Sequence, residues 1–332
     1  MRRFIAALLV AGLAACGGAP RSASRRTVRL AIFQDPITFL PLRVAQTLGY
    51  YAEEGLVVET SEVRGGAKAG QALVGGSVDV AAAAAVDAVQ LAVEGRDVRG
   101  FLLLYTRPTA ALVVAPSQSG RIRSISDLTG KSVGVSAPGS ASHQILNFLL
   151  ASNGLPFDAV STVSVGQSAS SVAALEHGTV DAAILLGSAI ATFERRHPEN
   201  HFLLDLRTPA GARQVFGSEV FPTLGLMAEE RWLRANGDTA RRLSRAVIRG
   251  MQWVRDHPAE EVRGMIPELA RTTVDSDLAA IRQIQTVLSA DGLMPAGAPA
   301  LIEKFVAVSN PKVKAGQIDI ARIYTSEFAS AR

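Results

Sequence analysis

Two serines at the start of a predicted helix are the residues best suited to hold a ligand. Ser140 and Ser142 flank Ala141 directly after Gly139, and the helix that follows carries apolar residues on one face. A helix N-terminus leaves backbone N–H groups open at the positive end of the helix dipole, so it can bind an anion to which two hydroxyls add donors. The sequence therefore predicts a ligand contact at 140–142. Capping of the helix by Ser140 alone is the alternative.

Loops after other predicted strands supply further candidates, because ligands in an open α/β sheet bind outside the carboxyl ends of the strands. Asp35 could pair with an amine or a pyrimidine N–H, or could form an Asx turn before Pro36. The other residues that this rule selects are Gln34, Thr38, Ala85, Val86, Gln167, Gly187 and Ser188. Spacing leaves open whether the site is also reached by Arg64, Tyr105, Arg107 and Arg213.

No arrangement of residues in the sequence matches a catalytic site or a metal site. Pro198 argues against a helix that presents His197 and His201 together, and the other histidines lack paired metal-ligand spacing. Asp79 and Asp181 occupy equivalent places before two predicted strands, so we expect them to lie away from a cleft and to fix the turns. We therefore expect no catalytic residue, no metal and no cofactor.

A repeated stretch indicates how the fold positions these residues. Residues 72–82 and 174–184 share Ala, Leu, Gly, Val and Asp at equivalent places. Each copy predicts a helix that ends at a Gly, a polar turn and an apolar strand buried on both faces. Such units predict an α/β fold with two lobes, each a mainly parallel sheet flanked by helices, and a cleft between them.

The first residues predict a leader and an anchor. Two arginines and the short apolar run after them indicate a signal peptide at 1–15. The sequence around Cys16 resembles the bacterial lipobox, which implies acylation of this residue and a flexible tether over 16–26. Cys16 is the only cysteine, which excludes a disulfide within the chain and a cysteine-based metal site. We expect a periplasmic or otherwise extracytoplasmic protein, held to a membrane by its lipid.

Composition places the boundaries of the two lobes. A polar break at 116–120 separates a first lobe, 27–115, from a second lobe, 116–220. Residues 221–332 are expected to return to the first lobe as a strand and helices, which makes two hinge crossings near 115 and 220. The formal net charge of +4 falls to +2 without the two arginines of the leader, and this gives no basis for binding nucleic acid.

Segments spread through most of the mature chain resemble one family, the substrate-binding lipoproteins of ABC importers for nitrate, taurine, aliphatic sulfonates and thiamine-pyrimidine precursors. The segments that carry the resemblance are 40–56, both copies of the repeated stretch, 125–135, Gly139-Ser140, Trp253 and 257–261. The resemblance implies a periplasmic-binding-protein fold, type II-like, that closes on its ligand by a hinge and then docks on a membrane permease.

We interpret the chain as a monomeric solute-binding protein that captures a small polar solute, anionic or heteroaromatic, and delivers it to an ABC permease with its ATPase. An enzyme of pyrimidine or thiamine-precursor chemistry on the same fold is one alternative. The related synthase relies on a cysteine-rich iron motif, whereas the sole cysteine here belongs to the lipobox. A ligand-binding component that feeds a sensor is the other alternative.

Overall fold

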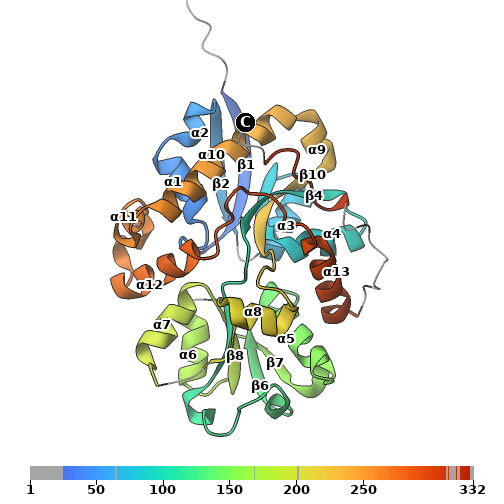
Figure 1. Ribbon diagram of the computed structural model, residues 1–332, viewed down its shortest axis with the longest axis vertical. Coiled ribbons are helices and arrows are strands. Elements are labelled where there is room, and N and C mark those ends of the chain that lie inside the picture. The colour runs from blue at the N-terminus through green and yellow to red at the C-terminus, as the bar shows by residue number, and fades with distance from the viewer. Residues whose placement is uncertain are drawn as a thin grey trace, which may run out of the picture.

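The computed structural model describes residues 25–63, 66–167, 169–199, 202–311, 313, 319 and 322–329. The predicted signal peptide, Cys16 and most of the tether lie outside these residues, as does Arg64. No helix in the described part of the chain is long and apolar enough to cross a membrane. The described chain forms two lobes, one above the other in Figure 1, with a five-stranded sheet at the centre of each.

The first lobe is built on a sheet with the strand order β2-β1-β3-β10-β4. Strands β1, β2 and β3 run parallel, whereas β10 runs antiparallel to both of its neighbours, β3 and β4. The bounds of these strands are Arg26–Phe33 for β1, Leu56–Val63 for β2, Val80–Ala84 for β3, Val98–Tyr105 for β4 and Leu224–Glu229 for β10. Four strands therefore share one direction and end at the same edge of the sheet.

The second sheet repeats this arrangement in the order β7-β6-β8-β5-β9. Strands β6, β7 and β8 run parallel, and β5 runs antiparallel to β8 and β9. The bounds are Ala110–Val114 for β5, Ser132–Val135 for β6, Ser161–Ser164 for β7, Ala182–Leu186 for β8 and Phe202–Asp205 for β9. The expected pair of mainly parallel sheets is thus confirmed, each with one antiparallel strand beside its parallel core.

Helices flank both sheets (Figure 1). The helices before β5 and after β10 are α1 (Leu40–Thr47), α2 (Tyr50–Glu53), α3 (Gly66–Val74), α4 (Ala85–Val93), α9 (Glu230–Ala235), α10 (Gly237–Asp256), α11 (Ala259–Gly264), α12 (Val274–Gln285) and α13 (Ala298–Ser309). The helices between β5 and β10 are α5 (Ala141–Ser152), α6 (Ala169–Glu176), α7 (Ser188–Arg196) and α8 (Pro209–Phe216). Short 3-10 turns lie at Pro116–Gln118, Ser126–Leu128, Phe157–Ala159 and Pro267–Arg271.

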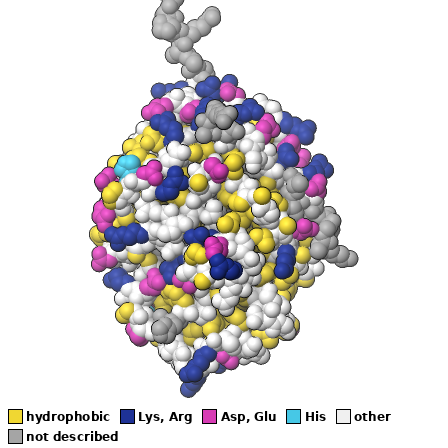
Figure 2. Space-filling view, viewed as in Figure 1, with side chains coloured by type: hydrophobic (Ala, Val, Ile, Leu, Met, Phe, Trp, Pro, Cys, Tyr) yellow, Lys and Arg dark blue, Asp and Glu magenta, His cyan; other side chains and the backbone are white. Residues whose placement is uncertain are grey.

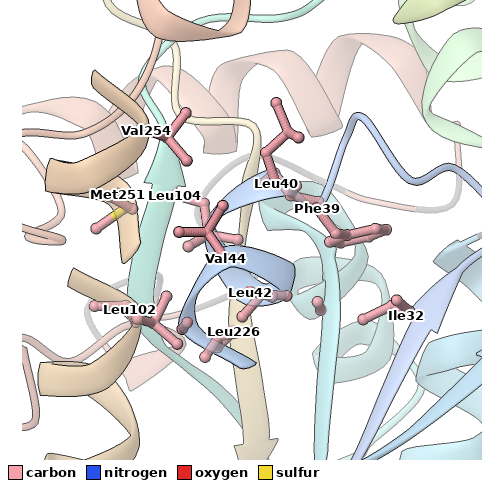
Figure 3. Packing of buried hydrophobic residues seen from close by; sticks show 14 of the residues in the cluster. Ile32, Phe39, Leu40, Leu42, Val44, Leu102, Leu104, Leu226, Met251 and Val254 are labelled. Atoms are coloured by element: carbon pink, nitrogen blue, oxygen red, sulfur yellow. The ribbon is translucent and has the colours of Figure 1, made fainter. Parts of the chain in front are cut away.

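The core of the first lobe joins α1 and α10 to the sheet. Figure 3 shows Val44 of α1, Met251 of α10 and Leu104 of β4 in one cluster of buried side chains. The two helices approach closely because Gly250 has no side chain: a Cβ there would lie 2.2 Å from the carbonyl oxygen of Pro41. Helix α10 therefore covers the first sheet although it follows the second lobe in the sequence.

The two aspartates of the repeated stretch make equivalent hydrogen bonds in the two lobes. Asp79 accepts the backbone N–H of Arg29 at 2.9 Å and also its guanidinium. Asp181 accepts the backbone N–H and the hydroxyl of Ser132, both at 2.8 Å, and the amide of Gln118. The backbone hydrogen bond from Ser132 lowers the pKa of Asp181. Each carboxylate thus ties its own strand to the neighbouring β1 or β6, at the edge of the sheet where these strands begin.

Replacing Asp181 with alanine is expected to lower the free energy of unfolding by about 2–3 kcal/mol, because hydrogen bonds to a charged group are lost and the N–H of Ser132 is left without its partner. Urea unfolding followed by circular dichroism measures the change. Asp158→Ala is the control, since Asp158 is exposed and its loss should cost less than about 0.5 kcal/mol. Equal losses in the two variants would contradict the role of Asp181.

The first boundary between the lobes differs from the predicted one. The predicted first lobe, 27–115, includes β5, but β5 pairs with β8 and β9 of the second sheet. The chain therefore crosses between the lobes at 106–109, and the polar break at 116–120 begins with a 3-10 turn inside the second lobe. An apolar run of five residues fits either sheet equally well, so only its long-range pairing decides its place.

Arginines of α10 lie on the surface in ion pairs. Arg242 pairs with Asp238, and Arg245 pairs with Glu54, at N–O distances of 2.9 and 2.6 Å. Figure 2 shows the same mixture over one face of the molecule, where Lys and Arg side chains are interspersed with Asp and Glu. The side chains of Arg245 and Glu54 are only 28% and 16% exposed, so this pair is partly buried. Those of Arg242 and Asp238 are 39% and 53% exposed, and a pair so exposed contributes only about 0–1 kcal/mol.

Candidate functional site

A cavity of about 650 Å³ lies between the two lobes. On the first-lobe side its wall is formed by residues at the ends of β1, β3 and β4, and on the second-lobe side by residues that follow β6, β7 and β8. The carboxyl ends of the parallel strands of both sheets therefore face one cavity, which is where α/β folds bind ligands. Its volume is in the range of small-molecule sites.

Most of the predicted site residues line this cavity. Gln34, Asp35 and Thr38 lie on the first-lobe wall. The second-lobe wall contains Ser140, Ala141, Gln167 and Gly187. The fold thus brings together two groups of residues that are far apart in the sequence, and it does so because each group follows the carboxyl end of a strand.

The other predicted residues, which are Ala85, Val86, Ser142 and Ser188, lie outside the cavity lining. Ala85 and Val86 are each only 5% exposed, because α4 begins directly after β3 and its first turn packs into the core. Ser142 is fully buried beneath the loop that precedes α5. Ser188 opens α7, and the preceding Gly187 occupies the cavity wall instead.

The two serines at the start of α5 have different roles: Ser140 lines the cavity, and Ser142 forms hydrogen bonds within the loop. Ser140 caps the helix, since its Oγ accepts the N–H of His143 at 3.3 Å, and it also lines the cavity. Ser142 accepts the backbone N–H of Ser136 at 2.9 Å, and its Oγ lies 2.9 Å from the hydroxyls of Ser136 and Ser140. Ser142 therefore orders the loop, while Ser136 and Ser140 belong to the cavity lining.

Asp35 forms the Asx turn that the sequence suggests and also lines the cavity. Its Oδ1 accepts the N–H groups of Ile37 at 3.0 Å and Thr38 at 3.3 Å, and its Oδ2 accepts the Thr38 hydroxyl at 3.0 Å. Burial raises the pKa of Asp35, and the hydrogen bonds from Thr38 and Ile37 act against this rise. The carboxylate is therefore held in one place on the cavity wall.

Asp87 is a charged lining residue that the strand-end rule misses. It lies in the first turn of α4, where its Oδ2 accepts the N–H of Ala84 at 3.0 Å. Burial raises the pKa of Asp87 to about 6, and the hydrogen bond from Ala84 acts in the opposite direction. An acidic residue three positions after the end of an apolar strand is typical of a helix start, so the capping pattern could have placed Asp87 in a first helical turn but not on a cavity wall.

The side chains whose reach the sequence leaves open are now placed. Tyr105 lines the cavity and donates its hydroxyl hydrogen to the carbonyl of Thr38. Arg107 and Arg213 are not part of the lining: Arg107 donates to the carbonyl of Thr286, and Arg213 pairs with Glu219. In the described ranges, no group of three or more His, Cys, Asp or Glu side chains could hold a metal ion.

Two chain crossings join the lobes beside the cavity. The first, 106–109, leads from β4 to β5, and the second, 217–223, leads from α8 to β10. The crossings are hydrogen-bonded to each other, with the N–H of Phe221 donating to the carbonyl of Thr106 at 2.8 Å and the Thr223 hydroxyl donating to the carbonyl of Arg107 at 3.0 Å. Two short adjacent segments of this kind permit one lobe to rotate against the other.

The two lobes lie close together at Gly187. Its φ is +52°, and a Cβ at this position would lie 3.1 Å from Oδ2 of Asp35 and 3.5 Å from Oγ1 of Thr38. Its N–H donates to the carbonyl of Thr109 in the first crossing at 2.9 Å. The second lobe therefore contacts Asp35 through the backbone of Gly187, and a Cβ at this position would require Asp35 to shift by a few tenths of an ångström.

Side chains outside the cavity also join the lobes. Nε of Arg195 in α7 donates to the hydroxyl of Ser276 in α12 at 3.1 Å. The amide of Asn147 in α5 donates to the carbonyl of Ser309 in α13 at 3.2 Å. The C-terminal helices α12 and α13 thus contact the second lobe at two places, and these contacts hold the lobes together around the cavity.

Comparison with known proteins identifies the family. The family model described as NMT1/THI5 like matches residues 37–261. The chain belongs to the NMT1/THI5-like family. The resemblance seen in the sequence and the two-lobed periplasmic-binding-protein fold that it implies are thereby confirmed.

This NMT1/THI5-like chain is similar to proteins from several bacteria. A solved structure from Bordetella bronchiseptica RB50 is 31% identical, with a TM-score of 0.84, over 92% of this chain and 96% of the other. The alkanesulfonate-binding protein SsuA from Xanthomonas axonopodis pv. citri, solved bound to MOPS, is 16% identical with a TM-score of 0.69, over 92% of this chain and 99% of SsuA. YtlA of Bacillus subtilis (strain 168), named as a binding protein, is 24% identical over 78% of this chain and 75% of its own length.

Proposed function

We propose that this chain is a solute-binding protein that captures a small polar solute between its lobes and delivers it to an ABC importer. The cavity between the lobes carries the proposal, because loops of both sheets form its walls and the two crossings that join the lobes lie beside it. The family and the binding-protein names of its relatives support the same role.

Solute capture uses polar groups from both walls. Gln34 lies on the first-lobe wall, and Ser140 and Gln167 lie on the second, so a solute between them contacts both lobes at once. Such a solute binds the closed arrangement better than an open one, and this difference in affinity drives closure at the crossings. The protein acts without chemical conversion of the solute.

The proposed setting follows from the leader. Acylation of Cys16 anchors the protein to a membrane outside the cytoplasm, and the tether lets the two lobes reach a permease. The protein works as a monomer, and the closed, loaded form docks on the permease.

Ligand-induced stabilisation tests the solute-binding function. A panel of alkylsulfonates, taurine, nitrate, bicarbonate, aminopyrimidines, riboflavin and small aromatic acids is added to the purified protein, and thermal unfolding is followed. A compound at ~100 times its dissociation constant adds about 2.7 kcal/mol of stability, which raises the midpoint visibly. Small-angle X-ray scattering should show a smaller radius of gyration with the same compound.

Two phenylalanine variants of α5 provide the control. Ala141→Phe fills part of the cavity and should remove the stabilisation, whereas Ala151→Phe, on the same helix and outside the cavity lining, should keep it. If neither these compounds nor a set of organic cations shifts the midpoint of protein shown by mass spectrometry to carry no co-purified molecule, the proposed function is wrong.

A further inference from the structure

The charges on the cavity wall are of one sign. Asp35 and Asp87 are the charged side chains that line the cavity in the described part of the chain, and every other described lining residue is neutral. Arg43 lies near Asp35 but outside the lining, and its guanidinium is paired with Glu62 and Glu268. Within these residues, the wall therefore presents two carboxylates and no cation.

Asp87 keeps one oxygen available to a ligand. Its Oδ2 accepts the N–H of Ala84, whereas its Oδ1 accepts no hydrogen bond from the described residues. The phenol of Tyr324 lies near this carboxylate, but it donates its hydrogen to the carbonyl of Ala85. No donor for Oδ1 comes from the described residues, so this oxygen can accept a hydrogen bond from a bound solute.

The hydroxyl groups near Asp35 are also already used in hydrogen bonds. The phenol of Tyr105 lies near it, but that hydroxyl donates to the carbonyl of Thr38. The hydroxyl of Thr38 is already used by Asp35 itself. The first-lobe wall therefore carries two carboxyl groups, and the hydroxyls of Thr38, Tyr105 and Tyr324 near them already have acceptors.

We propose that the solute carries a positively charged nitrogen, in an ammonium, amidinium or guanidinium group, whose N–H groups bind Asp87 and face Asp35. This assignment rests on the solute-binding function proposed above. A carboxylate inside a cavity is most stable beside a counter-charge that also donates hydrogen bonds, and N–H···O bonds between charged groups are about twice as strong as neutral ones. An anionic group at the same place would face the oxygens of two carboxyl groups.

The proposed charge is opposite to that of the anion expected at the start of α5. That expectation used the backbone donors and hydroxyls of the second-lobe wall alone. The carboxylate that the sequence did not reveal, Asp87, lies on the opposite lobe, and it makes the described lining of the cavity acidic. The solute's cationic end therefore lies toward the first lobe, and its neutral polar part lies toward Ser140 and Gln167.

Matched pairs of compounds test the assignment at pH 7.5. Benzamidine is compared with benzoate, 1,4-diaminobutane with butane-1-sulfonate, and methylguanidine with acetate, by thermal unfolding and titration calorimetry of the purified protein. At least one cation should raise the unfolding midpoint while its anionic partner does not. Asp87→Asn should weaken binding of that cation at least about tenfold, because a hydrogen bond between charged groups is lost. Asp158→Asn, which removes an exposed carboxylate away from the cavity, should bind it as the parent does.

The outcomes separate this assignment from the solute-binding function. Stabilisation by an anion or a neutral compound of either panel, with none by any cation, would overturn the cationic assignment and leave solute binding in place. Equal cation affinity in Asp87→Asn and Asp158→Asn would overturn the role of Asp87. Absence of stabilisation by every compound of both panels would count against solute binding itself.

Discussion

Gly187→Val is expected to weaken solute binding by more than about a hundredfold, which corresponds to about 3 kcal/mol. A Cβ at this position would lie 3.1 Å from Oδ2 of Asp35, and the two methyl groups of valine add further bulk where the second lobe meets the first. The lobes can then no longer approach as closely as the structure shows. A solute held by one wall alone loses the contacts that favour the closed arrangement.

Gly130→Val is the matched control for this variant. Gly130 also has a positive φ, of +73°, but a Cβ there would meet nothing within 4 Å, so this variant carries the strain of a positive φ without the contact between lobes. Titration calorimetry measures both affinities, and small-angle X-ray scattering measures closure. If Gly187→Val bound the solute as tightly as Gly130→Val, closure at Gly187 would not be part of the binding mechanism.

Asp87→Asn is expected to make the solute-free protein more stable at pH 7.5 by about 2 kcal/mol. Burial raises the folded-state pKa of Asp87 to about 6, whereas an unfolded aspartate has a pKa of about 3.9. The folded state therefore holds the proton more tightly, so this group's contribution to stability is complete below about pH 4 and is lost as the pH rises through 6. The amide has no charge to desolvate, and its oxygen can still accept the N–H of Ala84.

Urea unfolding at two pH values measures this effect. The difference in free energy of unfolding between Asp87→Asn and the parent should be about 2 kcal/mol at pH 7.5 and should shrink to within about 0.5 kcal/mol at pH 4.5. A difference that is the same at both pH values would show that the ionisation of Asp87 is not its cause. If the prediction holds, Asp87→Asn binds the cation less tightly than the parent but is more stable without it. Such a trade is expected where a binding site lowers the stability of the fold.

The sequence was sufficient to predict the fold because the fold depends on local patterns. The apolar runs that became β3 and β8 and the glycines that end the helices before them indicate buried parallel strands wherever they occur. Loops after such strands meet at one edge, so Asp35, Ser140 and Gly187 could be placed near one another without knowledge of any contact.

The features that the sequence could not place depend on partners far along the chain. Strand β5 is apolar at all five positions, so its pattern could not show that it pairs in the second sheet. Asp87 reads as an ordinary acid in a helical first turn, and only the approach of the second lobe makes it part of a cavity wall. Ser142 has the residue type of a ligand donor, but the folding of its loop turns its hydroxyl inward to Ser136.

The position of β10 between β3 and β4 sets the order in which the two lobes can be completed as the chain emerges from synthesis. The strands of the second sheet lie in one uninterrupted segment, 110–205, so all of them are present before β10 has been made. The first sheet cannot close until Leu224–Glu229 is available, because β4 pairs with β10 and with no earlier strand. On the nascent chain the second sheet can therefore be completed before the first, in which β1, β2 and β3 pair with one another early but β4 waits for β10.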